Sequence, residues 1–128
     1  MKRTALRKKP KAKSLSWWRQ KAWAIFSKWI RERDGYKCFT CGHQGEGPGI
    51  HSGHYIPRSI SQYLYFDERN VHAQCYRCNI HLSGNADRYA ELLGEELVKQ
   101  LRADKGKYKQ WCIEDFQNII KRYETNPK

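Results

Sequence analysis

Two C-x-x-C pairs constrain the fold of this chain more than any other feature. Cys38 and Cys41 form the first pair, Cys75 and Cys78 form the second, and 33 residues separate them. A C-x-x-C pair lets two thiolates reach one metal ion within a tight turn, and two such pairs complete a tetrahedral site. A redox role would need only one pair, usually within a βαβ pattern that is absent here. The spacing therefore predicts a structural zinc ion.

The composition agrees with a domain that needs such a stabiliser. The chain has 128 residues, which suits one domain, and only 39% of them are hydrophobic. Its mean hydropathy is −0.94, so the predicted core is small, and a structural zinc can add about 10 kcal/mol of folding free energy. The fifth cysteine, Cys112, is predicted to be a buried core thiol because it shares a helical face with apolar residues.

Neither a membrane span nor a secretory signal is expected. No apolar run approaches the roughly 20 residues that a membrane helix needs. The N-terminus is basic, but no apolar segment follows it. We therefore expect a cytoplasmic protein without disulfides.

The charge distribution predicts contact with nucleic acid. The net charge is +12, and residues 1–31 contain eleven Lys or Arg and no acidic residue. Residues 1–15 are predicted to be a flexible basic arm, because Pro10 and the lysine spacing give no amphipathic face. Such a basic block attracts phosphates. The alternative is a solvated tail that only aids solubility. The predicted DNA-binding residues here are Lys8, Lys9, Lys11, Lys13, Arg19 and Lys21.

Apolar periodicity predicts helices on both sides of a glycine-rich middle. A helix is expected over about 16–33, with Ser16 as N-cap and a stop at Asp34-Gly35. Short strands are expected near Tyr36–Phe39 and His51–Ile56. Residues 16–128 should form a single domain with a core of about 35–85 and C-terminal helices over 86–124. One of those helices should carry Tyr89, Leu93, Leu97 and Leu101; Trp17 and Trp23 lie off the apolar stripe of the first helix and are candidates for exposure.

The segment between the cysteine pairs carries a specific motif. H-S-G-H-Y-I-P-R-S over 51–59 is followed by an Asn shortly before C-x-x-C-N. This order resembles the HNH, or ββα-metal, nuclease motif. The chain resembles the phage NinG (Rap) recombination protein family more closely, and it is also similar to phage endonuclease VII, a junction-resolving nuclease. The likeness to the NinG family rests on F-S-K-W-I-R-E-R-D-G, C-F-T-C-G, I-H-S-G-H-Y, N-V-H-A-Q-C and C-N-I-H-L-S-G-N.

The resemblance implies both a fold and a set of residue roles. The fold would be α+β and mostly helical, with a zinc-stapled treble-clef or ββα-metal core flanked by helices. His54 matches the general base, Asn70 matches the Asn that orders the loop, and Asn79 matches a ligand of the catalytic metal. Glycine stands at position 53, where HNH enzymes commonly have a second, acidic or histidine ligand, and His51 could compensate for it.

The residue types also suit phosphodiester hydrolysis in their own right. Histidine supplies a base with a pKa near neutrality. Asparagine oxygen suits Mg²⁺, and an added histidine brings Mn²⁺ into range. Arg58 could clamp a phosphate, and His72 is a further candidate for contact with a metal ion or a DNA phosphate.

Three functions are compatible with this pattern. The first is a metal-dependent endonuclease acting on branched DNA, such as Holliday junctions or displacement loops, as a homodimer in the host cytoplasm. The second is a non-catalytic zinc module that binds nucleic acid, which Gly53 favours. The third is a sequence-specific HNH nuclease, although the chain has no clear recognition helix rich in Arg, Asn or Gln.

Overall fold

The first helix organises the molecule. The structure, a computed structural model, describes residues 12–124, so Lys8, Lys9 and Lys11 lie outside the described residues. Helix α1 (Leu15–Arg33) begins one residue earlier than predicted, because Ser14 and not Ser16 caps it: the Ser14 Oγ accepts from the Trp17 N–H at 3.1 Å. Its predicted end is confirmed, with Asp34 as C-cap and Gly35 at a φ of 65°.

A two-stranded antiparallel sheet lies against α1. Strand β1 (Ile50–His54) pairs with β2 (Val71–Cys75), and the register places His51 opposite Gln74 and Gly53 opposite His72. Ser52 faces the helix, where its hydroxyl donates to the Ser27 carbonyl at 3.0 Å. Since side chains alternate along a strand, His51, Gly53, Gln74 and His72 share the face that points away from α1.

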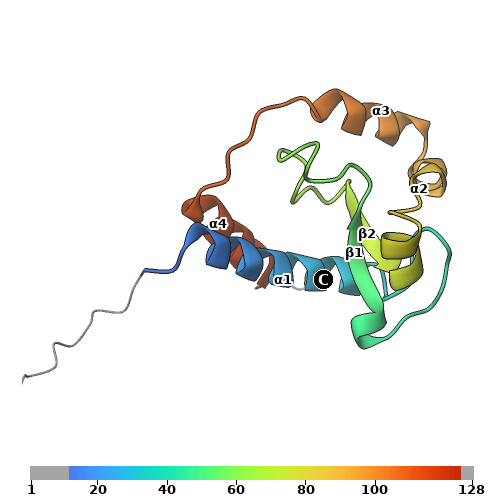
Figure 1. Cartoon of the computed structure of the whole chain (residues 1–128), viewed down its shortest axis with the longest axis horizontal. Coiled ribbons are helices and arrows are strands. Elements are labelled where there is room, and N and C mark those ends of the chain that lie inside the picture. Colours follow the sequence, from blue (N-terminus) through green and yellow to red (C-terminus); the bar gives the residue numbers. More distant parts are fainter. Residues whose placement is uncertain (1–11, 125–128) are drawn as a thin grey trace, which may run out of the picture.

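The main core lies between the two ends of the chain. Helix α4 (Ile113–Glu124) packs along α1, and the two helices run side by side in Figure 1. Phe26 of α1 and Phe116 of α4 are completely buried there, together with Val71 of β2. The small sheet is thus held by aromatic packing on the side that faces α1.

Short elements flank the two strands, and two further helices follow them. A short 3-10 turn, η1 (Gly47–Gly49), precedes β1, and a single π-helical turn, η2 (Arg77–His81), follows β2. Two helices come next, α2 (Ala86–Leu93) and α3 (Glu95–Asp104). The sequence pattern predicted one continuous helix here, which is wrong: Gly94 adopts a φ of 91°, outside the helical range, and divides the helix in two.

Two further expectations need correction. The stretch from Tyr36 to Phe39 is not a strand; it contributes one isolated bridge, between Lys37 and Gln44, to a tight turn. Cys112 is exposed and not buried, because α4 begins only at Ile113. Its thiol and its backbone N–H both donate to the Asp115 carboxylate, at 3.2 and 3.0 Å.

The helices and the small sheet agree with the expected α+β class, whereas the assignment to an HNH core remains a proposal. Within residues 12–124, no helix is both long and apolar enough to cross a membrane.

Candidate metal centre and adjoining cavity

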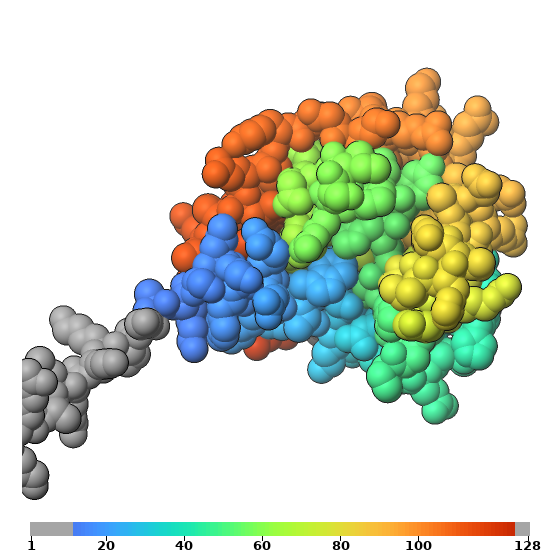
Figure 2. Space-filling model, in the orientation of Figure 1, coloured from blue at the N-terminus to red at the C-terminus, as the bar shows by residue number. Residues whose placement is uncertain are grey.

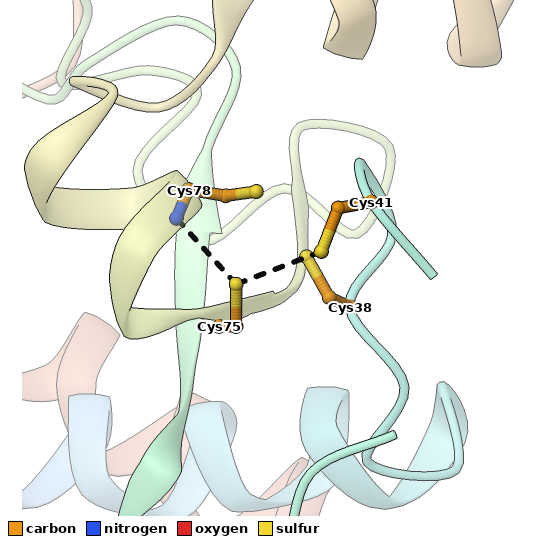
Figure 3. Close-up of side chains that lie close together, drawn as sticks. All are labelled: Cys38, Cys41, Cys75 and Cys78. Carbon is orange, nitrogen blue, oxygen red and sulfur yellow. Dashed lines mark hydrogen bonds between the residues drawn. The ribbon is translucent and has the colours of Figure 1, made fainter. Parts of the chain in front are cut away.

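The four cysteines of the C-x-x-C pairs converge on one point. Cys38 and Cys41 come from the turn after α1, Cys75 ends β2 and Cys78 lies in η2; Figure 3 shows their side chains close together. The four sulfur atoms lie within 4.8 Å of one another. The Cys41 and Cys75 sulfurs are 3.7 Å apart, close to the roughly 3.8 Å edge of a tetrahedron with Zn–S bonds of about 2.3 Å. The cluster could therefore hold a zinc ion, as predicted.

Local backbone hydrogen bonds shape the first half of this cluster. The Gly42 N–H donates to the Cys38 carbonyl at 2.9 Å, and the Cys38 N–H donates to the His43 carbonyl at 2.8 Å. Gly42 has a φ of 80°, which glycine adopts without the steric cost that other residues carry. The turn therefore presents both thiols in the same direction.

The thiols of the cluster differ in acidity. Burial raises the pKa of Cys38, but hydrogen bonds from the Thr40 hydroxyl and from neighbouring backbone groups outweigh this effect and lower it to about 6. Burial raises the pKa of Cys41 and of Cys75. The surroundings thus favour the thiolate at Cys38 and the neutral thiol at Cys41 and Cys75. A bound divalent cation would supply the positive charge that favours the thiolate at all of them.

His54 lies at the end of β1 in a restrained position. Its Nε2 is 2.9 Å from the Tyr65 carbonyl oxygen, and its ring stacks on Trp23 with centroids 5.0 Å apart. Because a carbonyl only accepts, Nε2 carries the proton and Nδ1 keeps its lone pair. Burial, together with the charge of Arg58, lowers the pKa of His54 although the Tyr65 carbonyl opposes the shift. His54 is therefore a neutral base at physiological pH.

An open cavity joins His54 to two other predicted residues. Trp23, His54, Arg58 and Asn79 line its wall, and its volume is about 630 Å³. Arg58 is exposed; its guanidinium donates to the Tyr65 hydroxyl at 2.9 Å and lies over the Tyr65 ring. Figure 2 shows this face, on which α1, the green loop after β1 and the yellow segment around η2 lie next to one another.

The predicted ligands of the catalytic metal, Asn79 and His51, lie beside this cavity. The Asn79 Nδ2 is 3.2 Å from the His51 Nδ1. Asn79 also borders a smaller neighbouring hollow of about 390 Å³, which His51 lines. The structure therefore brings His51, His54, Arg58 and Asn79 to one region, around two neighbouring hollows that Asn79 borders.

Asn70 has a different position from these residues. It is completely buried. Its Oδ1 accepts from the Ile56 N–H at 2.8 Å, and its Nδ2 donates to the Ile56 and Leu64 carbonyls at 2.9 and 3.2 Å. The side chain thus closes the loop between β1 and β2, which carries Arg58 and Tyr65, and it does not reach the cavity.

Replacing Asn70 by alanine is expected to lower the free energy of unfolding by about 3 kcal/mol, because it leaves buried backbone groups of Ile56 and Leu64 unpaired. Urea unfolding of the zinc-loaded chain measures this effect. Asn118, an exposed residue of α4, is the matched control, and Asn118→Ala should change stability little. A loss below about 1 kcal/mol in Asn70→Ala would show that the loop does not depend on this amide.

His72 is half-buried and contacts other residues of the scaffold, and its contact with a metal ion or a DNA phosphate stays a prediction. Its ring stacks on Phe39 with centroids 4.1 Å apart, and its Nδ1 is 3.1 Å from the Tyr89 hydroxyl. Burial and the charge of Arg33 lower its pKa to about 4. The sequence did not reveal these contacts of His72, because its partners come from distant segments.

The described basic residues of the predicted DNA-binding set lie along the start of α1. The ammonium groups of Lys13 and Lys21 lie over the two-ring system of Trp17, about 5 Å from its centroid. The Arg19 guanidinium lies over Phe116 of α4. Trp17 is thus partly covered, and Trp23 serves as the stacking partner of His54. Trp23 and Tyr65 are the cavity residues that the motif did not point to.

Fold and site together define a small α+β protein in which a four-cysteine cluster able to hold a metal ion adjoins a cavity lined by histidine, arginine and asparagine. The chain belongs to the NinG family: the family model described as Bacteriophage Lambda NinG protein matches residues 1–128.

Curated relatives support this membership. The chain is 34% identical to Protein ninG of Escherichia phage 933W over 121 residues, which cover 91% of this chain and 59% of the relative. Identity to Protein ninG of Escherichia phage lambda is 34%, and to that of Salmonella phage P22 33%, each over 91% of this chain and 58% and 59% of the relative. The chain therefore spans less than two thirds of the length of these relatives. No solved structure matches it.

Proposed function

We propose that this chain is a metal-dependent endonuclease of the HNH type that hydrolyses phosphodiester bonds in branched DNA. The observation that carries the proposal is His54, a neutral histidine with a fixed tautomer, in the same cavity wall as Arg58 and Asn79. The order β1, β2 and η2, with His54 on the first element and Asn79 on the last, also supports a ββα-metal arrangement.

Each residue has a defined task in this reaction. The His54 Nδ1 accepts a proton from the attacking water, while the Tyr65 carbonyl holds the ring through Nε2–H. Arg58 neutralises a phosphate oxygen from the exposed rim. Asn79 and His51 would hold a divalent cation, Mg²⁺ or Mn²⁺, which stabilises negative charge on the scissile phosphate and the leaving oxygen. Hydrolysis of this kind leaves a 5′-phosphate.

The charge distribution supports DNA as the substrate. The basic excess lies in residues 1–31. Of its described residues, Lys13 directly precedes the N-cap of α1, and Lys21 lies on α1, the helix that also supplies Trp23 to the cavity. Contacts from lysine and arginine to the backbone position a protein without reading sequence, so selectivity would come from DNA shape. Symmetric cutting of a four-way junction needs two active sites, which implies a homodimer.

Cleavage of a labelled four-way junction and of its matched linear duplex, in Mg²⁺ and in Mn²⁺, tests the proposal. We expect the zinc-loaded chain to cut the junction at least about tenfold faster, a difference of roughly 1.4 kcal/mol between the two substrates. Equal rates on both DNAs would refute selectivity for branches.

A non-catalytic DNA-binding module is the second candidate, and Gly53 favours it because this position supplies no metal ligand of its own. Tight binding of both DNAs with no cutting in either metal would establish this alternative and refute the nuclease.

A further inference from the structure

On the sheet face that points away from α1, another residue fills the space that a side chain at position 53 would occupy. A Cβ atom at Gly53 would overlap the Gln74 Oε1 and would lie 2.9 Å from the Asn79 Oδ1. Gln74 comes from β2, where it stands opposite His51, and its side chain is completely buried. The neighbouring strand therefore places an amide oxygen in the space that a side chain at position 53 would occupy.

The orientation of the Gln74 amide follows from its hydrogen bonds. Its Nε2 donates to the Gly84 carbonyl at 2.9 Å and to the Thr40 Oγ1 at 3.0 Å. Since the Gly84 carbonyl only accepts, the atom beside it must be nitrogen, and the oxygen must point toward Gly53. Within residues 12–124 this oxygen has no hydrogen-bond donor, although it is fully buried. Such unpaired buried oxygens are uncommon and call for a partner.

Asn79 brings a second oxygen to the same point. Its Nδ2 is directed to the His51 Nδ1, and its Oδ1 faces the Gly53 backbone on the same side as the Gln74 oxygen. Two amide oxygens that face the same space repel each other unless a donor or a cation lies between them. A small divalent cation removes this repulsion, because oxygen atoms are the ligands that Mg²⁺ and Mn²⁺ prefer.

We propose that Gln74 is a ligand of the divalent cation and that its Oε1 takes the place of the acidic side chain missing at position 53. The inference rests on the proposed function, since it names a further residue of the same cation site. It also explains the glycine: any side chain at position 53 would displace the Gln74 oxygen. Substitution of the two positions should therefore be coupled.

Mn²⁺ binding to the zinc-loaded full chain, followed by electron paramagnetic resonance of the free ion, tests this without reference to cleavage. Loss of an outer partner of a metal ligand weakens metal binding about 10- to 100-fold. Gln74→Ala should weaken Mn²⁺ binding by at least this factor. The double variant Gly53→Asp/Gln74→Ala should recover binding to the wild-type level or better, because a carboxylate then occupies the vacated space. Gln117→Ala, an exposed glutamine of α4, is the control and should bind as wild type.

The double variant separates ligation from a structural role. Both Gln74 variants lose the same hydrogen bonds to Thr40 and Gly84, so recovery in the double variant reports the restored oxygen ligand. Unchanged Mn²⁺ binding in Gln74→Ala, or no recovery in the double variant, would overturn the inference. Failure of the proposed function is distinct: a wild type that binds Mn²⁺ through Gln74 but cuts no junction leaves the cation site standing and refutes the nuclease.

Discussion

Replacing Cys78 by serine is expected to abolish the stable fold of this chain. Cys78 lies in η2, is completely buried, and belongs to the cluster whose four sulfurs lie within 4.8 Å of one another. A structural zinc ion contributes on the order of 10 kcal/mol, which is comparable to the whole stability of a typical domain, about 5–15 kcal/mol. The mean hydropathy of −0.94 agrees with a small apolar core, so we expect the loss of zinc to unfold the chain.

Zinc content and thermal unfolding of Cys78→Ser measure this effect. We expect the bound zinc to fall close to zero and the cooperative unfolding transition to disappear, as it should in the wild type after treatment with a strong chelator. Cys112→Ser is the matched control, because it makes the same atomic change at an exposed thiol outside the cluster. A Cys78→Ser protein that unfolds cooperatively near the wild-type temperature would show that the cluster is not a structural metal centre.

His54→Ala is expected to eliminate junction cleavage while the protein stays folded and binds DNA. Removal of a general base costs about 10²- to 10⁴-fold in rate, and the variant also loses the ring that stacks on Trp23. Single-turnover cleavage, junction binding and zinc content are to be measured on the same preparation. His43→Ala, a change at an exposed histidine of the cysteine turn, should cut at the wild-type rate.

The pH profile offers an independent check on this base. Burial lowers the pKa of His54 below its ordinary value of 6.5, so the neutral form persists to lower pH than usual. As the pH falls through this lowered pKa, Nδ1 takes up a proton and can no longer accept one from water. The acid limb of the cleavage profile should therefore lie below pH 6.5. A rate in His54→Ala within about tenfold of wild type would contradict the assigned role.

The helices and strands were predictable from the sequence to different extents. The end of α1 at Arg33 followed from the local Asp34-Gly35 signal. The split between α2 and α3 did not, because the apolar four-residue repeat continues through Gly94 and conceals the change in backbone direction. Strand β2 was also missed: Val71 and Ala73 are buried but are interleaved with His72 and Gln74, which look like surface residues in the sequence alone.

The sequence by itself identified the four cysteines as a metal cluster and His54, Arg58 and Asn79 as candidate site residues, because C-x-x-C spacing and the motif are local along the chain. The resemblance also assigned Asn70 to ordering a loop. Only the tertiary structure decided which backbone groups Asn70 bonds, that His72 contacts Tyr89 and that Gln74 occupies the space beside Gly53. The physical reason is that these contacts depend on the register between β1 and β2. A shift of one residue would turn Gln74 to the opposite face of the sheet, and no local pattern encodes that register.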